Sequence, residues 1–157
     1  MNDAVDTLRT FPDLDAFCQA AGTELGGGEW FLVDQERIDA FADVTEDWQW
    51  IHVDRERAAV GPYGAPVAHG YLTLSLIPRL GGAIFSVEGA RAQVNYGSNK
   101  VRFPQPVTAG SRIRAVATLV STEWTPVGLQ AVIRYTIEIQ GQHKPACVAE
   151  TVRLLVP

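Results

Sequence analysis

The sequence has few cysteines and no excess of positive charge. Cys18 and Cys147 are the only cysteines among 157 residues, and they lack the clustered spacing of a metal site or a disulfide framework. We interpret both as small core residues of a reduced, cytoplasmic protein. Lys and Arg number 13 against 18 Asp and Glu, which gives a net charge of −5. This balance leaves no surplus of cations for a phosphate backbone or an anionic membrane, so neither is expected as a partner.

Long hydrophobic runs are also absent. The apolar stretch 70–77 is too short to span a bilayer and ends at Pro78 and Arg79. The first residues, MNDAVDTLRTF, lack the basic start and apolar stretch of an export signal. Hydrophobic residues make up 46% and charged residues 20%, which is ordinary for a globular protein of this length. We therefore expect a single domain over residues 1–157, without a membrane span.

Helical signals dominate the first part of the chain. Residues 13–21 place apolar side chains at helical spacing before Gly22. The three glycines at 26–28 predict a flexible turn, and residues 29–33 predict a short strand. Asp34 is a suitable N-cap for an amphipathic helix that we expect to end near residue 45.

The segment that follows is irregular up to a second helical region. Asp54 can cap a short helix through Ala59, and the Gly and Pro cluster at 61–66 predicts a loop. From Gly70 the run YLTLSLI is apolar on every face apart from its hydroxyls, which can bond back to their own helix. This pattern predicts a buried helix that a sheet wraps.

The second half of the chain predicts strands. Short extended runs at 90–96 and 100–103 are interrupted by Gly97. Three longer strands are expected at 112–119, 132–139 and 147–156. Their short connections, without crossover helices, favour an antiparallel α+β arrangement. Several folds share a helix packed on such a sheet, so periodicity alone does not identify one.

Three segments carry a family resemblance: FADVTEDWQWIHVD, AHGYLTLSL and NYGSNKVRFPQPVTAG. They resemble the MaoC-like family of (R)-specific enoyl-CoA hydratases, or hydratase 2, and the QWIHVD form looks closest to its actinobacterial, NodN-like branch. The resemblance implies the α+β hotdog fold, in which an antiparallel β-sheet wraps a long central helix. It also implies a homodimeric hydro-lyase of fatty acid metabolism that uses a CoA thioester as substrate and needs no metal or redox cofactor.

The family motif reads small residue, Gly, Asp, any residue, Asn, Pro, any residue, His, and TEDWQWIH occupies it here. Asp47 and His52 keep the reactive pair. Glu46 stands where Gly is usual, and Gln49 and Trp50 replace Asn-Pro. We therefore expect the backbone turn and the hydrogen bonding around the acid to differ from those of the family.

A carboxylate and an imidazole five residues apart, on a loop after a helix, can converge on one water molecule. Hydration of a trans-2-enoyl thioester requires one group to take a proton from water and another to deliver a proton to Cα, and Asp47 and His52 suit these roles. Enolate charge develops at the thioester oxygen, where backbone N–H groups of the helix opened by Gly70 are candidate donors. The other candidate substrate contacts are Gln49, Asn95 and Tyr96, with strand packing as the alternative for the last two.

Other polar and aromatic residues near the motif have two interpretations each. His69 is expected to orient its loop rather than to line the pocket. Trp48 and Trp50 either wall the acyl pocket or pack against the core or a dimer partner. Cations after the motif either meet the phosphates of CoA or a carrier-protein arm, or form solvated strand faces: Lys100, Arg102, Arg112 and Arg114. Homodimerisation would cover the edge strand that a single hotdog leaves unpaired.

Three functions are consistent with these residues. We predict an (R)-specific enoyl-CoA hydratase, which adds water reversibly to a trans-2-enoyl thioester and gives the (R)-3-hydroxyacyl product. A 3-hydroxyacyl-thioester dehydratase of a synthetic pathway would use the same residues in reverse on carrier-bound chains. A non-catalytic acyl-CoA-binding or scaffold subunit would keep the fold without turnover, and the departures at Glu46 and Gln49 keep this alternative open.

Overall fold

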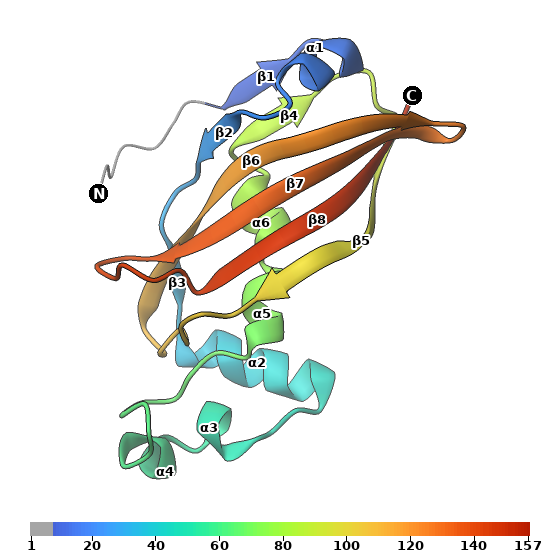
Figure 1. Ribbon diagram of the computed structural model, residues 1–157. Helices are drawn as coiled ribbons and strands as arrows, with labels where there is room; N and C mark the ends of the chain where they lie inside the picture. The colour runs from blue at the N-terminus through green and yellow to red at the C-terminus, as the bar shows by residue number, and fades with distance from the viewer. Residues whose placement is uncertain (1–7) are drawn as a thin grey trace.

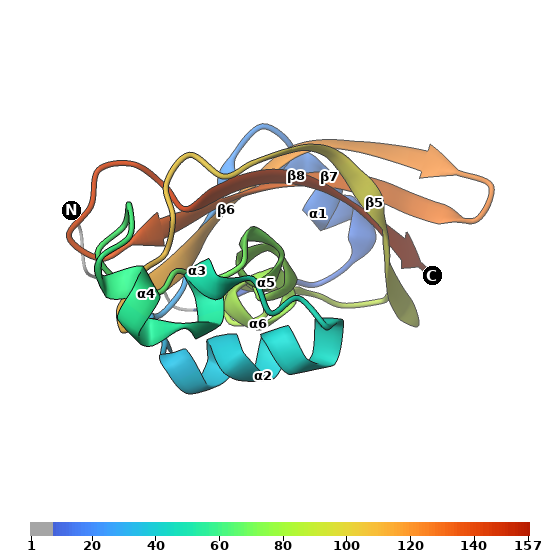
Figure 2. The same cartoon turned by 90° about the horizontal axis from the view of Figure 1, so that it is seen from below.

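A curved antiparallel sheet wraps one side of a helical axis in the computed structural model, which describes residues 8–157 (Figures 1 and 2). The sheet order is β2-β6-β7-β8-β5, and β3 also pairs with β6. Its strands are β2 (Glu24–Gly27), β3 (Phe31–Val33), β5 (Ala92–Arg102), β6 (Ser111–Thr125), β7 (Gly128–Ile139) and β8 (Cys147–Val156). A separate parallel pair joins β1 (Arg9–Phe11) to β4 (Phe85–Val87).

The helices lie on the concave side of the sheet and at both of its ends (Figures 1 and 2). They are α1 (Leu14–Gln19), α2 (Gln35–Thr45), α3 (Trp50–Val53), α4 (Arg55–Ala59), α5 (Gly70–Ser75) and α6 (Ile77–Gly81). The central axis consists of α5 and α6, and α2 packs on its side away from the sheet. No helix within residues 8–157 combines the length and hydropathy of a membrane span.

The long strands form because their side chains alternate between two faces. Opposite residues of β6 and β7 pair as Ile113 with Ile139, Ala115 with Ile137, and Ala117 with Tyr135, and all six are buried. Such alternation places one face of each strand against the core. The predicted strands in this half are confirmed, and β6 and β7 extend further than expected, to a tight turn between Thr125 and Gly128.

The central helix approaches the sheet closely. A Cβ on Gly81 would lie 2.7 Å from the Tyr135 ring, so only glycine fits at this point of α6. Helical structure continues beyond the apolar stretch 70–77 in α6, because proline is tolerated in the first turn of a helix. The expectation of burial on every face was wrong, since Tyr71 is 71% exposed.

Two further expectations were wrong for reasons of long-range pairing. Residues 26 and 27 belong to β2 and pair with β6 across an irregular register, and Gly28 lies so close to Leu80 that a Cβ would meet its carbonyl oxygen at 3.0 Å. The glycines therefore allow close packing rather than a flexible turn. The strand β5 runs on through Gly97, and register shifts on either side of that residue absorb the irregularity.

The two cysteines are free thiols. Cys147 is fully buried in the core, and this burial raises the pKa of its thiol to about 11. Cys18 is half-buried and packs against the same core. Both positions agree with the interpretation of these residues as small core side chains.

Candidate active site

The end of α2 positions Asp47. Asp34 caps the start of this helix by accepting a hydrogen bond from the Arg37 N–H at 2.9 Å, as predicted. At the other end Glu46 adopts a left-handed conformation with φ 58° and ψ 30°, and the Asp47 N–H returns to the Ala42 carbonyl at 3.1 Å. This arrangement ends a helix in the way that glycine usually does. The turn is therefore kept although glutamate occupies the position.

Three backbone contacts fix His52 in α3. Its Nδ1 lies 2.6 Å from the Val67 carbonyl oxygen, and the Val67 N–H donates to the Ile51 carbonyl at 3.0 Å. The side chain of Gln35, at the start of α2, donates to the His52 carbonyl at 2.7 Å. The imidazole is thus held between α2 and the loop that leads to α5.

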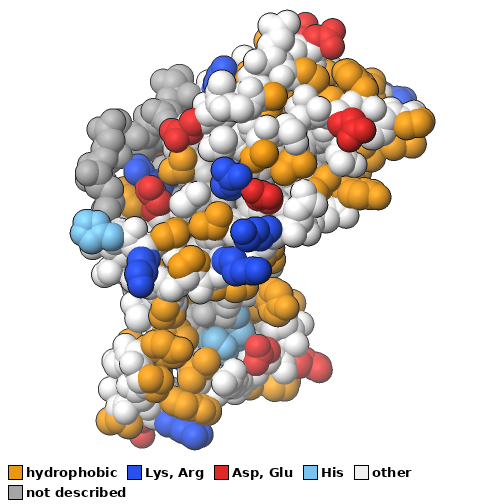
Figure 3. Space-filling model, in the orientation of Figure 1, with side chains coloured by type: hydrophobic (Ala, Val, Ile, Leu, Met, Phe, Trp, Pro, Cys, Tyr) orange, Lys and Arg blue, Asp and Glu red, His pale blue; other side chains and the backbone are white. Residues whose placement is uncertain are grey.

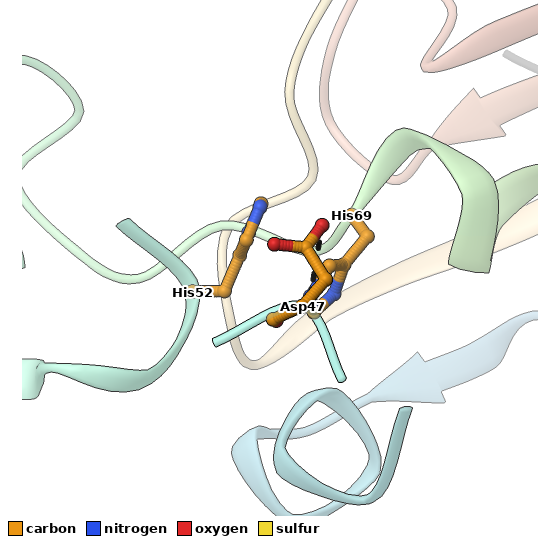
Figure 4. A group of neighbouring side chains, drawn as sticks. All are labelled: Asp47, His52 and His69. Carbon is orange, nitrogen blue, oxygen red and sulfur yellow. Dashed lines mark hydrogen bonds and ion pairs between the residues drawn. The ribbon is translucent and has the colours of Figure 1, made fainter. Parts of the chain in front are cut away.

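His69 contacts both Asp47 and His52. It is the N-cap of α5 and is only 3% exposed. Its ring stacks on that of His52, with centroids 3.8 Å apart, and also contacts Phe41. Its Nε2 lies 3.0 Å from the backbone oxygen of Asp47 and 4.0 Å from the carboxylate Oδ2. Figure 4 shows the three side chains converging from three separate segments.

The hydrogen bonds determine which ring nitrogens carry protons. His52 donates from Nδ1 to a carbonyl, so in the neutral ring Nε2 bears the lone pair. Burial lowers the pKa of His52 below its ordinary value; neighbouring His69 acts in the same direction, whereas the Val67 hydrogen bond and Asp47 oppose them. At neutral pH His52 is therefore a base that can accept a proton at Nε2.

A pocket of about 280 Å³ adjoins this cluster. His52, Gly70 and Thr73 contribute to its wall, and its other lining residues are mostly apolar: Ile51, Tyr63, Val67, Ala68, Phe103, Gln105, Pro106, Val107 and Ala146. A Cβ at Gly70 would lie 3.2 Å from the Phe103 ring, so glycine allows this aromatic to close against the start of α5. The imidazole and the first turn of α5 thus face one pocket.

The other predicted substrate-binding residues, Gln49, Asn95 and Tyr96, do not line the His52 pocket. Gln49 is exposed, and its backbone N–H, rather than its side chain, lies 3.4 Å from Asp47 Oδ1. Asn95 lines a different hollow, beside α5 and β8, and Tyr96 is 71% exposed on the edge strand. The structure does not bring these three side chains into the His52 pocket, and their substrate contacts stay predictions.

The two tryptophans are also outside the residues that line the pocket. Trp48 is 55% exposed and donates to Asp43 at 2.8 Å, and Trp50 packs under the Arg57 guanidinium. Sequence reasoning missed Gln35 and Phe103 because their contacts with the site join segments far apart in the chain. No local pattern marks either residue.

Asp47, His52 and His69 are also the one group in residues 8–157 whose ligand atoms cluster closely enough to consider a metal, within 4.8 Å of one another. Two of the four ring nitrogens already face backbone carbonyls, which accept hydrogen bonds from protonated nitrogens. Those two nitrogens cannot also bind a metal while they carry protons, whereas the unprotonated Nε2 of His52 is able to accept a proton. The expectation that no metal is required stays a prediction.

Comparison with known proteins places the chain among related sequences and folds. Residues 17–140 match the family model described as MaoC like domain. The 3-hydroxyacyl-thioester dehydratase Z of Mycobacterium tuberculosis H37Rv is 49% identical over 146 residues, covering 92% of this chain and 97% of that protein. Nodulation protein N of Rhizobium leguminosarum is 40% identical, covering 85% of each chain. The solved (R)-hydratase of A. caviae, at 23% identity, has a TM-score of 0.70 over 87% of this chain and 98% of that one.

Proposed function

The chain belongs to the MaoC-like dehydratase family, a family of hydro-lyases, and on this premise we propose that it adds water reversibly to a trans-2-enoyl-CoA to give the (R)-3-hydroxyacyl thioester. The family assignment confirms the predicted resemblance, and the neighbouring solved structures confirm the α+β hotdog fold. The observation that carries the proposal is that side-chain atoms of Asp47, His52 and His69 lie within 4.8 Å of one another beside a pocket that His52 and Gly70, the first residue of α5, help to line.

The proposed chemistry follows from the proton positions. A water molecule between His52 Nε2 and the Asp47 carboxylate can donate one hydrogen bond to each, because both groups are acceptors. As the water oxygen bonds to Cβ, one of them takes a proton, and the enolate that forms at Cα is then protonated by the same pair. The two protons of water thus end on the hydroxyl and Cα, and no redox step is needed.

The thioester oxygen collects negative charge during this addition. The first N–H groups of α5 that donate to a carbonyl at the start of the helix are those of Leu72 and Thr73, which both point to the His69 carbonyl. The N–H of Gly70 precedes them, and Gly70 lies at the pocket wall. We propose that the Gly70 N–H donates to this oxygen. Removing one such donor typically costs about 10² to 10³ in rate.

The direction of the reaction is set by substrate supply, since the same groups catalyse hydration and dehydration. The name of the mycobacterial relative favours dehydration of a 3-hydroxyacyl thioester, and that of the A. caviae structure favours hydration. The non-catalytic alternative was based on Glu46 and Gln49. Glu46 keeps the left-handed turn, Gln49 is not among the residues that line the pocket, and Asp47 and His52 still lie close together.

An assay with crotonyl-CoA and a longer enoyl-CoA tests the proposal. Hydration is followed by the loss of enoyl absorbance, and the hand of the product is determined with an (S)-specific 3-hydroxyacyl-CoA dehydrogenase, which should not oxidise it. His143→Gln is a matched control, because His143 is exposed in the turn before β8. A folded wild-type protein that binds acyl-CoA without turning it over would favour the non-catalytic alternative instead.

We also propose that the chain acts as a homodimer. The edge strand β5 is exposed along almost its whole length and carries Val94 and Tyr96, which are 48% and 71% exposed. Unpaired edges of this kind are usually covered, and a second copy of β5 would continue the sheet. Light scattering during size-exclusion chromatography measures the mass directly. A cytoplasmic location stays a prediction.

A further inference from the structure

A group of cations surrounds a shallow hollow on the outer face of the sheet. The hollow, about 260 Å³ in volume, is lined by Lys100 and Arg102 of β5, Arg134 of β7, and Val148 and Glu150 of β8. We refer to these five residues as the basic hollow. Figure 3 shows Lys and Arg side chains gathered over the sheet, directly above a recess in which a histidine surface is visible.

The positive charge of the basic hollow is only partly compensated. The strand register places Glu150 between Lys100 and Arg134, and Arg134 Nη2 binds its carboxylate at 2.7 Å. Three cations against one carboxylate leave an excess of two positive charges, on a chain whose net charge is −5. Neighbouring like charges on one sheet face are unfavourable unless an anion joins them.

Arg112 and Arg114, the other two cations considered from the sequence, do not line the basic hollow. Arg114 is buried and bound to Glu138 at 2.7 Å, with its guanidinium over the Trp30 ring. Arg112 is exposed on β6 and does not line the basic hollow. Lys100 and Arg102 are therefore the main candidates for binding an anion. Arg134 also lines the basic hollow, but its guanidinium is bound to Glu150.

Two paired strands, β5 and β8, connect the basic hollow to the His52 pocket, because on each strand a residue of the hollow lies within two residues of one that lines the pocket. Arg102 is followed directly by Phe103, which lines the pocket. Val148 of β8, the strand partner of Arg102, lies two residues from Ala146, which also lines the pocket. A chain that leaves the pocket past Phe103 and Ala146 therefore reaches these cations next.

We propose that the basic hollow binds a phosphate of the phosphopantetheine arm whose thioester lies in the His52 pocket. This inference rests on the proposed function, because it assumes a thioester substrate. An Arg guanidinium can hold two phosphate oxygens at once, and a Lys ammonium adds a mobile point charge. CoA and an acyl carrier protein share this phosphate, so the chemistry is common to both sources.

Three crotonyl thioesters test the assignment: those of pantetheine, phosphopantetheine and CoA. The variant Lys100→Glu/Arg102→Glu is compared with Arg91→Glu, which makes the same kind of charge change before the other end of β5, roughly 30 Å away along the strand. The quantity measured is kcat/KM for each phosphorylated ester divided by kcat/KM for the pantetheine ester. We expect this ratio to fall by about tenfold or more in the double variant, as for loss of charged hydrogen bonds, and to stay unchanged in the control.

The outcomes separate the possible phosphate sources. An equal fall for phosphopantetheine and CoA esters assigns the basic hollow to the phosphate that CoA shares with carrier proteins. A fall for the CoA ester alone assigns it to the phosphates of the nucleotide. An unchanged ratio for both esters overturns the proposal, while turnover of the pantetheine ester by all variants leaves the proposed function standing.

A binding measurement keeps the test independent of turnover. CoA is titrated into the wild-type protein and both variants by calorimetry at low and at moderate salt. We expect the dissociation constant to rise about tenfold in the double variant and its salt dependence to weaken, because exposed charges are screened. Equal affinity and equal salt dependence in the wild type and the double variant would contradict the proposal even if the protein proved catalytically inactive.

Discussion

The imidazole rings of His52 and His69 stack with their centroids 3.8 Å apart and their planes 22° apart. His69 also bonds the backbone oxygen of Asp47, so one buried ring contacts both members of the proposed catalytic pair. The neighbouring His69 ring also helps to lower the pKa of His52, because it disfavours a positive charge there. His69 therefore affects both the position of Asp47 and the basicity of His52.

The first prediction concerns His69 as a positioning residue. In His69→Phe the aromatic contacts with His52 and Phe41 can persist, but the hydrogen bond to Asp47 is lost. We expect kcat to fall by about 10- to 100-fold with little change in KM, because small displacements of a catalytic group have effects of this order. The acid limb of the pH profile should also move to higher pH, since His69 helps to lower the His52 pKa. A variant with reduced kcat and an unmoved acid limb would indicate a purely structural role.

The second prediction concerns the pH dependence of the wild-type protein. The pKa of His52 is lowered from its ordinary value of 6.5, mainly by burial, so the imidazole stays neutral to a lower pH than in the unfolded chain. The acid limb of kcat/KM should therefore lie below pH 6.5. An acid limb at or above that pH would contradict the assignment of His52 as the base.

The same shift affects stability with a defined sign. Between the lowered folded pKa and 6.5, the unfolded chain binds more protons at His52 than the folded chain does, so this contribution to stability is lost as the pH falls through that window. Denaturant titrations of the wild type and His52→Gln at several pH values measure it. The substituted protein should lack this part of the pH dependence.

The third prediction concerns the turn after α2. Glu46 is the one residue other than glycine with positive φ among residues 8–157. Because glycine tolerates this conformation without the Cβ penalty, Glu46→Gly should raise the free energy of unfolding by about 1 kcal/mol. Chemical denaturation measures the change, and Glu36→Gly in the first turn of α2 provides the control, which should be destabilised. Destabilisation by Glu46→Gly would mean that the glutamate side chain stabilises the turn.

The sequence predicted the elements whose signals are local. The caps Asp34 and Asp54 and the alternation along β6 to β8 each depend on neighbouring residues, and the structure confirms them. The strand β2 was missed because its glycines lack strand propensity and are held there by pairing with β6. Long-range contacts decide such segments.

In the candidate active site too, residues marked by a local motif could be predicted, and long-range contacts could not. Asp47 and His52 could be chosen from the motif, because both lie within a few residues of each other after a capped helix. The Gln35 contact with the His52 carbonyl and the packing of Phe103 against Gly70 could not, because they join residues distant in sequence. The expectation that His69 orients its loop agrees with its hydrogen bond to the Asp47 backbone.

The fourth prediction concerns metal dependence. His52 Nδ1 and His69 Nε2 both face carbonyl oxygens, which leaves the cluster poorly suited to coordinate a metal through those atoms. Prolonged dialysis against a chelator should leave kcat unchanged, and elemental analysis of the active protein should find no stoichiometric metal. Loss of activity on chelation, with recovery on adding back one divalent metal, would reverse this interpretation of the cluster.

The central claim is that Asp47 and His52 together catalyse addition of water to an enoyl thioester. It is tested most directly by the steady-state rate of crotonyl-CoA hydration by the wild type, Asp47→Asn and His52→Gln, with folding of each variant verified by circular dichroism. We predict turnover by the wild type and a loss of at least about 10²-fold in kcat for each variant, because each removes a proton acceptor from the reacting water. Full activity in either folded variant would contradict the claim.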